Sequence, residues 1–465
     1  MHALPPHSTA IFDAVLVSCY ELGHEPLGAL TPAGVLDRAG FRARVLDVAV
    51  EDFDARACAS APLIAISTPM HTALRLGARV AARVREVNPS AHICFYGLYA
   101  ELHAGHLVPR LADSCLGAEF EADLLALVSA VATRGDASPR SVRVTAPPRI
   151  AARTRERSLD LSPRRPAQKG ETRYVRLRAD GEDLPTAYIA TTRGCKHTCR
   201  HCPIPAAYDG SFYALDPRAV LADIDAGVAR GARHITFADA DFLNGPTHAL
   251  RIARALHERH PGVTFDYTAK VEHLLRHPDV VDELHALGSL FVVSAVESFN
   301  EEVLRRLDKG HTAADALEVI RAFARRGLTL RPSLMPFTPW ETRVSLAQLF
   351  DIVAREGLVE QIDPVQYSIR LLVPAGSLLL RDPSTAPLFG AFDVARFTHP
   401  WVHPDPGMDV IQATLAEISA LAPAEENPIE HTFRRMAEVV APGREIALSP
   451  RRRGETPRLT EDWFC

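Results

Sequence analysis

The stretch TTRGCKHTCRHCPIP, residues 191–205, places three cysteines within eight positions of the chain. Cys195, Cys199 and Cys202 have the spacing C-x3-C-x2-C. Three close thiols suit a disulfide pair, a zinc site or an iron–sulfur cluster. A 4Fe–4S cluster is usually held by four cysteines. A cluster on three would therefore leave one iron open to bind a small molecule and pass it an electron.

The number and spacing of the ligands weaken the zinc alternative. A structural zinc site takes four ligands, usually as two pairs, and no second C-x2-C pair is present in the sequence. His197 and His201 are available as a fourth ligand, but each lies between two of the cysteines, so chelation would be strained. A disulfide would leave one of the three thiols over.

The bulk properties predict a cytoplasmic protein without a membrane anchor. The chain has 465 residues, enough for two or three domains. Its net charge of −5 argues against a general nucleic-acid binder. No apolar run reaches the roughly 20 residues that a membrane helix needs, and residues 1–15 lack the layout of a signal peptide. Thiols stay reduced in the cytoplasm, which further opposes a disulfide.

The first part of the chain alternates between strand-like and helix-like stretches. Apolar runs at 13–20, 62–68 and 92–97 predict buried strands, and the amphipathic stretch 70–89 predicts a helix. Short apolar strands separated by helices indicate a parallel sheet with right-handed crossovers. We therefore expect residues 1–130 to form a doubly wound domain whose ligands bind at the carboxyl ends of the strands.

The rest of the chain divides into three parts, and the fold class is α/β. Residues 131–183 are rich in arginine, proline and serine, and we expect a linker with solvated basic side chains. Residues 184–380 alternate again, which predicts a partial (β/α)6 barrel with its chemistry at the carboxyl ends of the strands. Residues 381–465 are predicted to be mostly helical. The six candidate barrel strands are 185–192, 234–239, 263–268, 290–296, 328–335 and 364–372.

Cysteines spaced C-x3-C-x2-C after the first strand of a partial barrel resemble the radical S-adenosylmethionine (SAM) superfamily. The resemblance implies a 4Fe–4S cluster on Cys195, Cys199 and Cys202, with SAM bound to the open iron. It also implies that one electron cleaves SAM and produces a 5′-deoxyadenosyl radical. The residues that would act directly on a substrate are unknown at this stage.

Two stretches farther along the chain resemble the same superfamily. ITFADADFLN ends the second strand with Asp239 and Asp241 and resembles the segment that holds the methionine amino group, although the common Gly-Gly-Glu is replaced. VSAVESFNEEVLRRLDKGHT resembles a stretch in which Glu297 and Ser298 would contact the ribose or carboxylate of SAM, with phenylalanine where glycine is common. Lys270, in DYTAKVEHL, either faces the barrel mouth or has a structural role.

The front domain resembles the cobalamin-binding domain that precedes many radical enzymes of this type. The stretches HEPLGALTPAGVLDRAGF, ISTPMHTALRLGARVA and GAEFEADLLALV carry the resemblance. Domains that ligate cobalt through histidine have D-x-H-x-x-G, whereas His24 is preceded by Leu22 and followed by Gly28 at a different spacing. Either cobalamin is bound without a protein histidine, or the fold has kept the shape and lost the cofactor.

The leading functional hypothesis is a radical SAM enzyme that acts on an unidentified small molecule, with cobalamin-dependent methylation as one outcome. A flavodoxin or ferredoxin is the expected electron donor, and neither nucleic acid nor a membrane is an expected partner. A cobalamin-free rearrangement or C–C bond formation is the alternative within enzymes. A non-catalytic zinc or redox-sensing protein is the alternative from another class, and it would hold zinc rather than about four irons.

The tail RLTEDWFC, which ends at Cys465, resembles the tail of a radical SAM family recognised by a Cys-Sec-Ala-Glu-Pro or Cys-Cys-Ala-Glu-Pro motif. Selenocysteine is encoded by UGA, which automated translation takes as a stop. The resemblance therefore suggests a truncated selenoprotein, whose gene would have UGA after the codon of Cys465 and then Ala-Glu-Pro in frame. A UAA or UAG codon there would leave Cys465 as an ordinary terminal thiol.

Overall fold

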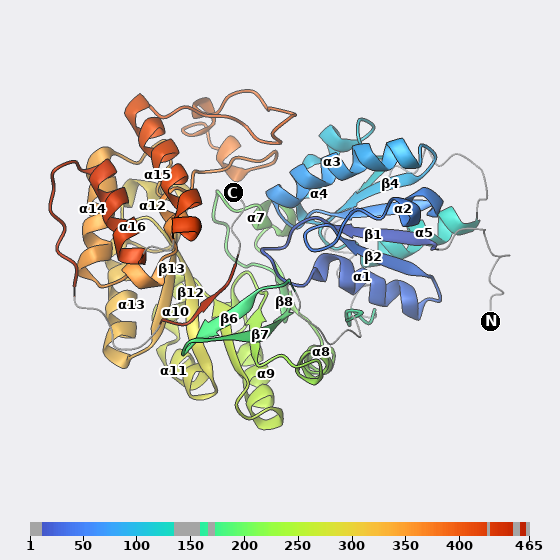
Figure 1. The fold of residues 1–465 in the computed structure, drawn as a ribbon, viewed down its shortest axis with the longest axis horizontal. Helices are drawn as coiled ribbons and strands as arrows, with labels where there is room; N and C mark the ends of the chain where they lie inside the picture. The colour runs from blue at the N-terminus through green and yellow to red at the C-terminus, as the bar shows by residue number, and fades with distance from the viewer. Residues whose placement is uncertain (1–11, 134–158, 166–172, 426–427, 450–455, 462–465) are drawn as a thin grey trace.

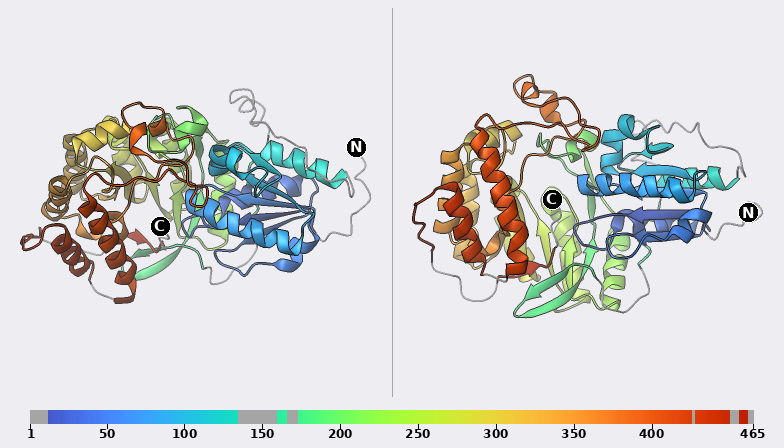
Figure 2. Two further views of the ribbon diagram at one scale, coloured as in Figure 1. Left: turned by 90° about the horizontal axis from the view of Figure 1, so that it is seen from above. Right: turned by 45° about the horizontal axis from the view of Figure 1, so that its top comes forward.

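A computed structural model describes residues 12–133, 159–165, 173–425, 428–449 and 456–461. Figure 1 shows two α/β bodies side by side, an N-terminal one in blue and a second in green to orange. The two views of Figure 2 place the last helices of the chain on the side of the second body that is remote from the first. The thiol of Cys465 lies outside the described residues.

The N-terminal body is the doubly wound domain that the sequence predicts. Its five strands are parallel and lie in the order β2-β1-β3-β4-β5. All side chains of β1, β3 and β4 are buried, as expected when helices cover both faces of a parallel sheet. The elements are β1 (Ala14–Ser18), α1 (Leu27–Arg38), β2 (Ala43–Asp47), α2 (Ala55–Ser60), β3 (Leu63–Ser67), α3 (His71–Val87), β4 (His92–Tyr96), α4 (Leu98–Leu107), β5 (Ser114–Leu116) and α5 (Glu121–Thr133).

The second body is built on a curled sheet with the order β13-β12-β11-β10-β7-β6-β14. Strands β7 and β10 to β13 are parallel, whereas β6 and β14 pair antiparallel at one edge. The strands are β6 (Arg176–Ala179), β7 (Glu182–Ile189), β10 (His234–Phe237), β11 (Thr264–Thr268), β12 (Ser289–Glu297), β13 (Thr329–Leu334) and β14 (Arg458–Leu459), and a separate hairpin pairs β8 (Thr192–Gly194) with β9 (Phe212–Ala214).

Helices alternate with these strands, and their ends follow local sequence signals. Helix α13 begins at a capping box in which Thr312 and Asp315 satisfy each other's backbone N–H groups, and it ends at Gly327 with φ +72°. The helices of this body are α7 (Ile204–Tyr208), α8 (Pro217–Ala229), α9 (Pro246–Arg259), α10 (Val271–Arg276), α11 (Pro278–Ala286), α12 (Glu301–Leu307), α13 (Ala313–Arg326), α14 (Arg343–Arg355), α15 (Pro406–Glu425) and α16 (Ile429–Val440), with five short 3-10 turns between them (η1, Phe242–Asn244; η2, Val359–Gln361; η3, Pro364–Tyr367; η4, Leu378–Leu380; η5, Ala386–Leu388). Among the described residues, no helix is long and apolar enough to cross a membrane.

The sixth predicted barrel strand, 364–372, is the element that the sequence analysis gets wrong. Pro364 opens the 3-10 turn η3, and within residues 364–372 the ladder contact is a single bridge between Arg370 and Phe337. Proline has no N–H to donate to a ladder and suits the first position of a helical turn. The free edge of β13 is capped by a side chain instead, because Gln366 Oε1 accepts the N–H of Leu334 (2.9 Å).

The segment predicted to be a linker, 131–183, contributes to the packed structure where it is described. Its residues 176–179 form β6, which pairs with β7. Arg165 is not solvated as expected. Its side chain is only 4% exposed and donates to Glu25 of the N-terminal domain (2.7 Å) and to Asp223 of α8 (2.7 and 2.8 Å). Arg165 therefore joins the two bodies through buried, charge-assisted hydrogen bonds.

Candidate functional site

The three cysteines lie in the loop that follows β8, at the carboxyl end of the first barrel strand. Cys195 and Cys199 are buried and Cys202 is half-buried, and none of them forms a disulfide with another described cysteine. The turn before them needs a glycine. Gly194 has φ +76°, and a Cβ there would lie 2.4 Å from the carbonyl oxygen of Ser211.

Backbone hydrogen bonds hold this cysteine loop against its neighbours. The N–H of Cys195 donates to the Ser211 carbonyl (3.2 Å), and the N–H of Arg200 donates to the Leu307 carbonyl at the end of α12 (2.8 Å). Burial raises the pKa of the Cys202 thiol to about 12, with Cys199 and Cys195 close enough to add to that effect. Because a metal ligates thiolates, its positive charge must offset this cost. Three free, clustered thiols shielded from water fit a 4Fe–4S cluster.

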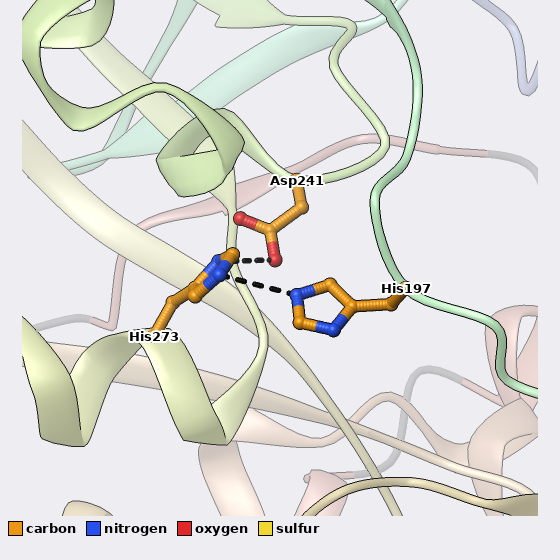
Figure 3. A group of neighbouring side chains, drawn as sticks. All are labelled: His197, Asp241 and His273. Carbon is orange, nitrogen blue, oxygen red and sulfur yellow. Dashed lines mark hydrogen bonds and ion pairs between the residues drawn. The ribbon is translucent and has the colours of Figure 1, made fainter. Parts of the chain in front are cut away.

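Two histidines and a carboxylate connect the cysteine loop to the barrel (Figure 3). His273 of α10 is fully buried, and its Nδ1 lies 2.8 Å from Asp241 Oδ2. Its Nε2 lies 3.1 Å from Nε2 of His197, the histidine between the first two cysteines. Burial lowers the pKa of His197 to about 4, so its ring is neutral at pH 7. His197, Asp241 and His273 could also hold a metal ion, since Nδ1 of His273 lies close to Asp241 but has no hydrogen-bond partner among the described residues.

Asp241 accepts hydrogen bonds from two separate segments near the cysteine loop. Its two oxygens accept the N–H groups of Leu243 (2.9 Å) and Lys270 (3.2 Å), so it links the turn after β10 to the start of α10. Lys270 immediately precedes α10, is 7% exposed, and places its Nζ 3.8 Å from Glu272 Oε2. Asp241 and Lys270, two of the residues singled out from sequence, are therefore neighbours.

Asp239 is satisfied by the protein rather than free for a ligand. Its carboxylate accepts the N–H of Thr191 (3.0 Å) and the hydroxyl groups of Thr191 and Thr192, directly before the cysteine loop. Burial raises the pKa of Asp239 to about 6. The residue thus ties the end of β10 to the end of β7, and it also lines the cavity described below.

Glu297 lies at the carboxyl end of β12 with the unusual backbone angle φ +66°. It accepts a hydrogen bond from Lys309 Nζ (3.1 Å), and its Oε1 lies 3.3 Å from Nε2 of His201 in the cysteine loop. The ammonium group of Lys309 and the His201 ring hold the pKa of Glu297 well below its usual range, against the opposing effect of burial. Ser298 points elsewhere, since its hydroxyl donates to Glu341 (3.0 Å).

Sequence reasoning did not single out Lys309 or His273. Lys309 is 2% exposed and pairs with a residue twelve positions earlier, so only the KGHT stretch in which it lies was a signal. His273 lies in KVEH, directly after Lys270, and nothing local indicates that it meets the cysteine loop. The contacts of Lys309 with Glu297 and of His273 with His197 can be recognised only in the folded structure, where the ends of the strands lie together.

A cavity of about 180 Å³ lies on the concave side of the curled sheet. Adjacent strands β10 to β13 contribute one wall, and the N-terminal domain and the segment after β14 contribute others. Representative lining residues are Thr236, Asp266, Phe291, Arg331, His24 and Glu461. The three cysteines and Glu297 are not among the lining residues, so this cavity is distinct from the thiol cluster.

The carboxyl edge of the N-terminal sheet lies against the barrel. Arg193 of β8 donates to Glu121 at the start of α5 (2.9 Å). His24 is also turned to the barrel, because its ring stacks on Tyr188 at 4.2 Å and its Nε2 lies 3.1 Å from Glu461. Nδ1 of His24 has no hydrogen-bond partner among the described residues, and the D-x-H-x-x-G spacing is absent.

Comparison with known proteins bears on the cysteine loop directly. The model of the radical SAM superfamily matches residues 189–350, which include the three cysteines and strands β10 to β13. This segment is a radical SAM domain. The family expected from sequence is thereby confirmed, and the cofactors that such a domain implies are a 4Fe–4S cluster and SAM.

Two relatives of known function match part of this chain. One is the tRNA-2-methylthio-N(6)-dimethylallyladenosine synthase of Haemophilus influenzae, 24% identical over 217 residues, which are 44% of this chain and 45% of that protein. The other is the ribosomal protein uS12 methylthiotransferase RimO of Cereibacter sphaeroides, 27% identical over 191 residues, which are 39% and 41% of the two chains. The match thus spans less than half of each relative.

Two solved structures resemble the chain over both bodies. The cobalamin-dependent SAM radical enzyme OxsB, with aqua-cobalamin and SAM bound, has a TM-score of 0.65 at 13% identity and covers 92% of this chain and 70% of its own. The radical SAM methyltransferase TsrM from Kitasatospora setae, with tryptophan substrate and a SAM analogue bound, has a TM-score of 0.57 at 18% identity and covers 74% and 71%. At these identities the likeness shows the fold, which confirms the predicted fold class.

Proposed function

We propose that this chain is a radical SAM enzyme that cleaves SAM reductively and directs the resulting radical at a small molecule. The observation that carries the proposal is the set of three free cysteines in the loop after the first barrel strand, within the segment that matches the superfamily. The cluster, when bound, supplies the electron that splits SAM into methionine and a 5′-deoxyadenosyl radical. A flavodoxin or ferredoxin is the expected source of that electron.

The side chains around the thiols would have separate roles. Cys195, Cys199 and Cys202 hold the cluster. The His197–His273–Asp241 chain orients the loop that carries them, since it joins that loop to α10 and to the end of β10.

Glu297 lies at the end of β12 and would bind the nucleoside of SAM, with Lys309 keeping its carboxylate ionised. Ser298 would contribute through its backbone, because its hydroxyl group already donates to Glu341. Asp239, Asp241 and Lys270 would line the methionine end through the segments that they anchor, because their carboxylate and backbone groups are already used within the protein.

The substrate would be small. The cavity of about 180 Å³ is below the 300–1,000 Å³ typical of sites for drug-sized ligands. Its walls come from the sheet, from the N-terminal domain and from the segment after β14, so a macromolecule would have to insert a single residue or base to reach it. A free small molecule can enter the cavity without inserting part of a larger chain.

Cobalamin-dependent methylation is a second candidate for the reaction. The likeness of the whole chain to OxsB and TsrM favours it, since cobalamin is bound in structures of both proteins. In this chain the corrinoid would be held without a histidine, because His24 is engaged by Tyr188 and Glu461. Incubation of the anaerobic protein with hydroxocobalamin, followed by gel filtration and absorbance spectroscopy, tests whether a stoichiometric corrinoid is retained.

The primary test is anaerobic reconstitution followed by metal analysis and product detection. We expect brown protein with about four irons per chain and dithionite-dependent formation of 5′-deoxyadenosine. Cys199→Ala should lose that product, whereas Cys58→Ala, which removes a buried thiol of α2 in the N-terminal domain, should keep it. Colourless protein with bound zinc, or full cleavage activity in Cys199→Ala, would contradict the proposal.

A further inference from the structure

The cavity in the half-barrel has buried polar groups that the protein does not satisfy. Arg331 of β13 is 7% exposed and Gln361 of η2 is 3% exposed, and both line the cavity. Among the described residues, Nη1 of Arg331 and Oε1 of Gln361 have no hydrogen-bond partner. Buried polar atoms are nearly always paired, so an orphaned donor and acceptor on the same cavity call for a partner within it.

The contacts of Arg331 leave one edge of its guanidinium group available to a ligand in the cavity. Nη2 donates to Asp363 Oδ2 (2.8 Å), which fixes the plane, and the guanidinium carbon lies 5.9 Å from the centre of the Phe291 ring. Nη1 remains for a ligand. A guanidinium group matches planar oxyanions such as carboxylates. The nearby Gln361 oxygen would accept a hydrogen bond from a hydroxyl or amine next to that oxyanion.

Two strands away on the same sheet, the lining of the cavity carries a negative charge. Asp266 of β11 is 3% exposed, and its Oδ1 accepts from His234 (2.9 Å) and Thr236 (2.8 Å). Its Oδ2 accepts from no described residue. The described lining carries four carboxylates, Asp239, Asp266, Asp363 and Glu461, against the single arginine. A ligand with only negative charge would be repelled there, whereas an amine would be attracted.

We propose that the cavity binds a small dipolar molecule, with an oxyanion on Arg331 and an amine on Asp266. This inference rests on the proposed function, because it describes the substrate of the same enzyme. Strands β13 and β11 are separated by β12, so the two residues are two strand spacings apart, roughly 10 Å along the sheet. The long arginine side chain shortens the gap between the charged groups. An unbranched chain of a few carbons between amine and carboxylate would span it.

The amino-acid end of SAM is not the molecule inferred here. That end would have to reach the open iron at the three cysteines, and none of these lines the cavity. The only residue common to the cavity and the expected methionine site is Asp239, whose carboxylate is already bonded to Thr191 and Thr192. The dipolar ligand would therefore lie on the far side of Asp239 from the cluster, within the barrel.

The test uses three probes that differ only in their charged ends: 5-aminopentanoate, pentanoate and pentylamine. Binding to the anaerobically reconstituted holoprotein, with SAM present and no reductant, is measured by isothermal titration calorimetry. We expect 5-aminopentanoate to bind at least about tenfold more tightly than either single-ended probe, which is the contribution of one charge-assisted hydrogen bond. Equal binding of the three probes, or no binding of any, would overturn the proposal.

Variants assign the two ends. Arg331→Met should reduce the affinity for 5-aminopentanoate to that for pentylamine, and Asp266→Asn should reduce it to that for pentanoate. Arg331→Lys keeps the cation and should retain part of the preference, which covers the case that Arg331→Met fails to fold. Arg254→Met removes an exposed arginine that pairs with Glu283 on the outer helices, and it should leave the preference unchanged. An unchanged preference in Arg331→Met would reject the assignment.

The failure of this inference and that of the proposed function can be told apart. Formation of 5′-deoxyadenosine with dithionite reports SAM cleavage in the same holoprotein and does not depend on the probes. Cleavage without probe discrimination would overturn the dipolar ligand alone. Discrimination without cleavage would overturn the radical SAM activity and leave the dipolar ligand supported.

Discussion

Removal of the Glu297 carboxylate should have two separable effects. The side chain of Lys309 is 2% exposed, and its ammonium group donates to Glu297 Oε1 over 3.1 Å. Glu297→Ala leaves that ammonium buried without its partner, and breaking a buried pair in this way costs about 3–5 kcal/mol of stability. If Glu297 also binds the nucleoside of SAM, the same variant should lower the affinity for SAM by about tenfold to hundredfold, or about 1.5–3 kcal/mol.

Three variants separate these effects. Glu297→Gln keeps the shape and a hydrogen-bond acceptor, and the double variant Glu297→Gln with Lys309→Met removes both charges together. The double variant should regain most of the stability that Glu297→Ala loses, because no buried charge is left alone, while its affinity for SAM stays low. Stability is followed by tryptophan fluorescence during urea unfolding, since Trp401 belongs to a buried hydrophobic cluster and Trp340 packs against it. Affinity for SAM is measured by calorimetry on holoprotein of matched iron content.

The pH dependence supplies an independent check. The pKa of Glu297 is depressed in the folded state, so its contribution to stability is fully present above the unfolded value of about 4.3 and is lost as the pH falls below it. The difference in stability between the wild type and Glu297→Gln should therefore be constant from neutral pH to about pH 5 and shrink in more acidic solution. If Glu297→Ala has wild-type stability and wild-type affinity for SAM, neither the buried pair nor the nucleoside assignment is correct.

Three further predictions concern the N-terminal domain and its contact with the barrel. His24→Ala should leave the absorbance spectrum of any bound corrinoid unchanged, because His24 is stacked on Tyr188; a large spectral shift would show that it reaches cobalt. Burial raises the pKa of Glu21 to about 8, so the folded state holds a proton that the unfolded state releases, and stability should fall as pH rises from about 5 to 8; Glu21→Gln should remove that slope in thermal unfolding curves, and a slope as steep as in the wild type would contradict this account. Arg165→Met should destabilise the protein by about 3–5 kcal/mol, since it leaves Asp223 of α8 without its buried cation. Limited proteolysis of this variant should then release the two bodies as separate fragments. A protease pattern like that of the wild type would refute the role of Arg165 in joining them.

Much of the fold follows from local patterns in the sequence. The apolar runs at 62–68 and 92–97 become β3 and β4, and the amphipathic stretch 70–89 becomes α3. A continuous apolar run indicates a strand that is buried on both faces, and apolar residues at helical spacing indicate a helix that is buried on one face. Both patterns can therefore be recognised without knowing what the element packs against. The cysteine triplet is visible for the same reason, because its three ligands lie within a single loop.

Local patterns could not decide what lies next to what. Residues 364–372 are apolar enough for a strand, yet Pro364 opens a turn and the side chain of Gln366 takes the place of a ladder partner. Arg165 belongs to a basic, proline-rich stretch, yet it is buried because Glu25 and Asp223 come from two separate bodies and meet there. Composition describes an average environment, whereas a single buried charge depends on its partners.

The sequence by itself determined the order of strands and helices, the radical SAM domain and the three thiols that would hold its cluster. Only the tertiary structure decided which polar groups surround them. Lys309 pairs with Glu297, His273 lies between Asp241 and the cysteine loop, and Arg331 and Asp266 line the same cavity. These pairings arise because parallel strands bring their ends to one edge and their inward side chains to one concave face, which places residues far apart in the chain within hydrogen-bond distance.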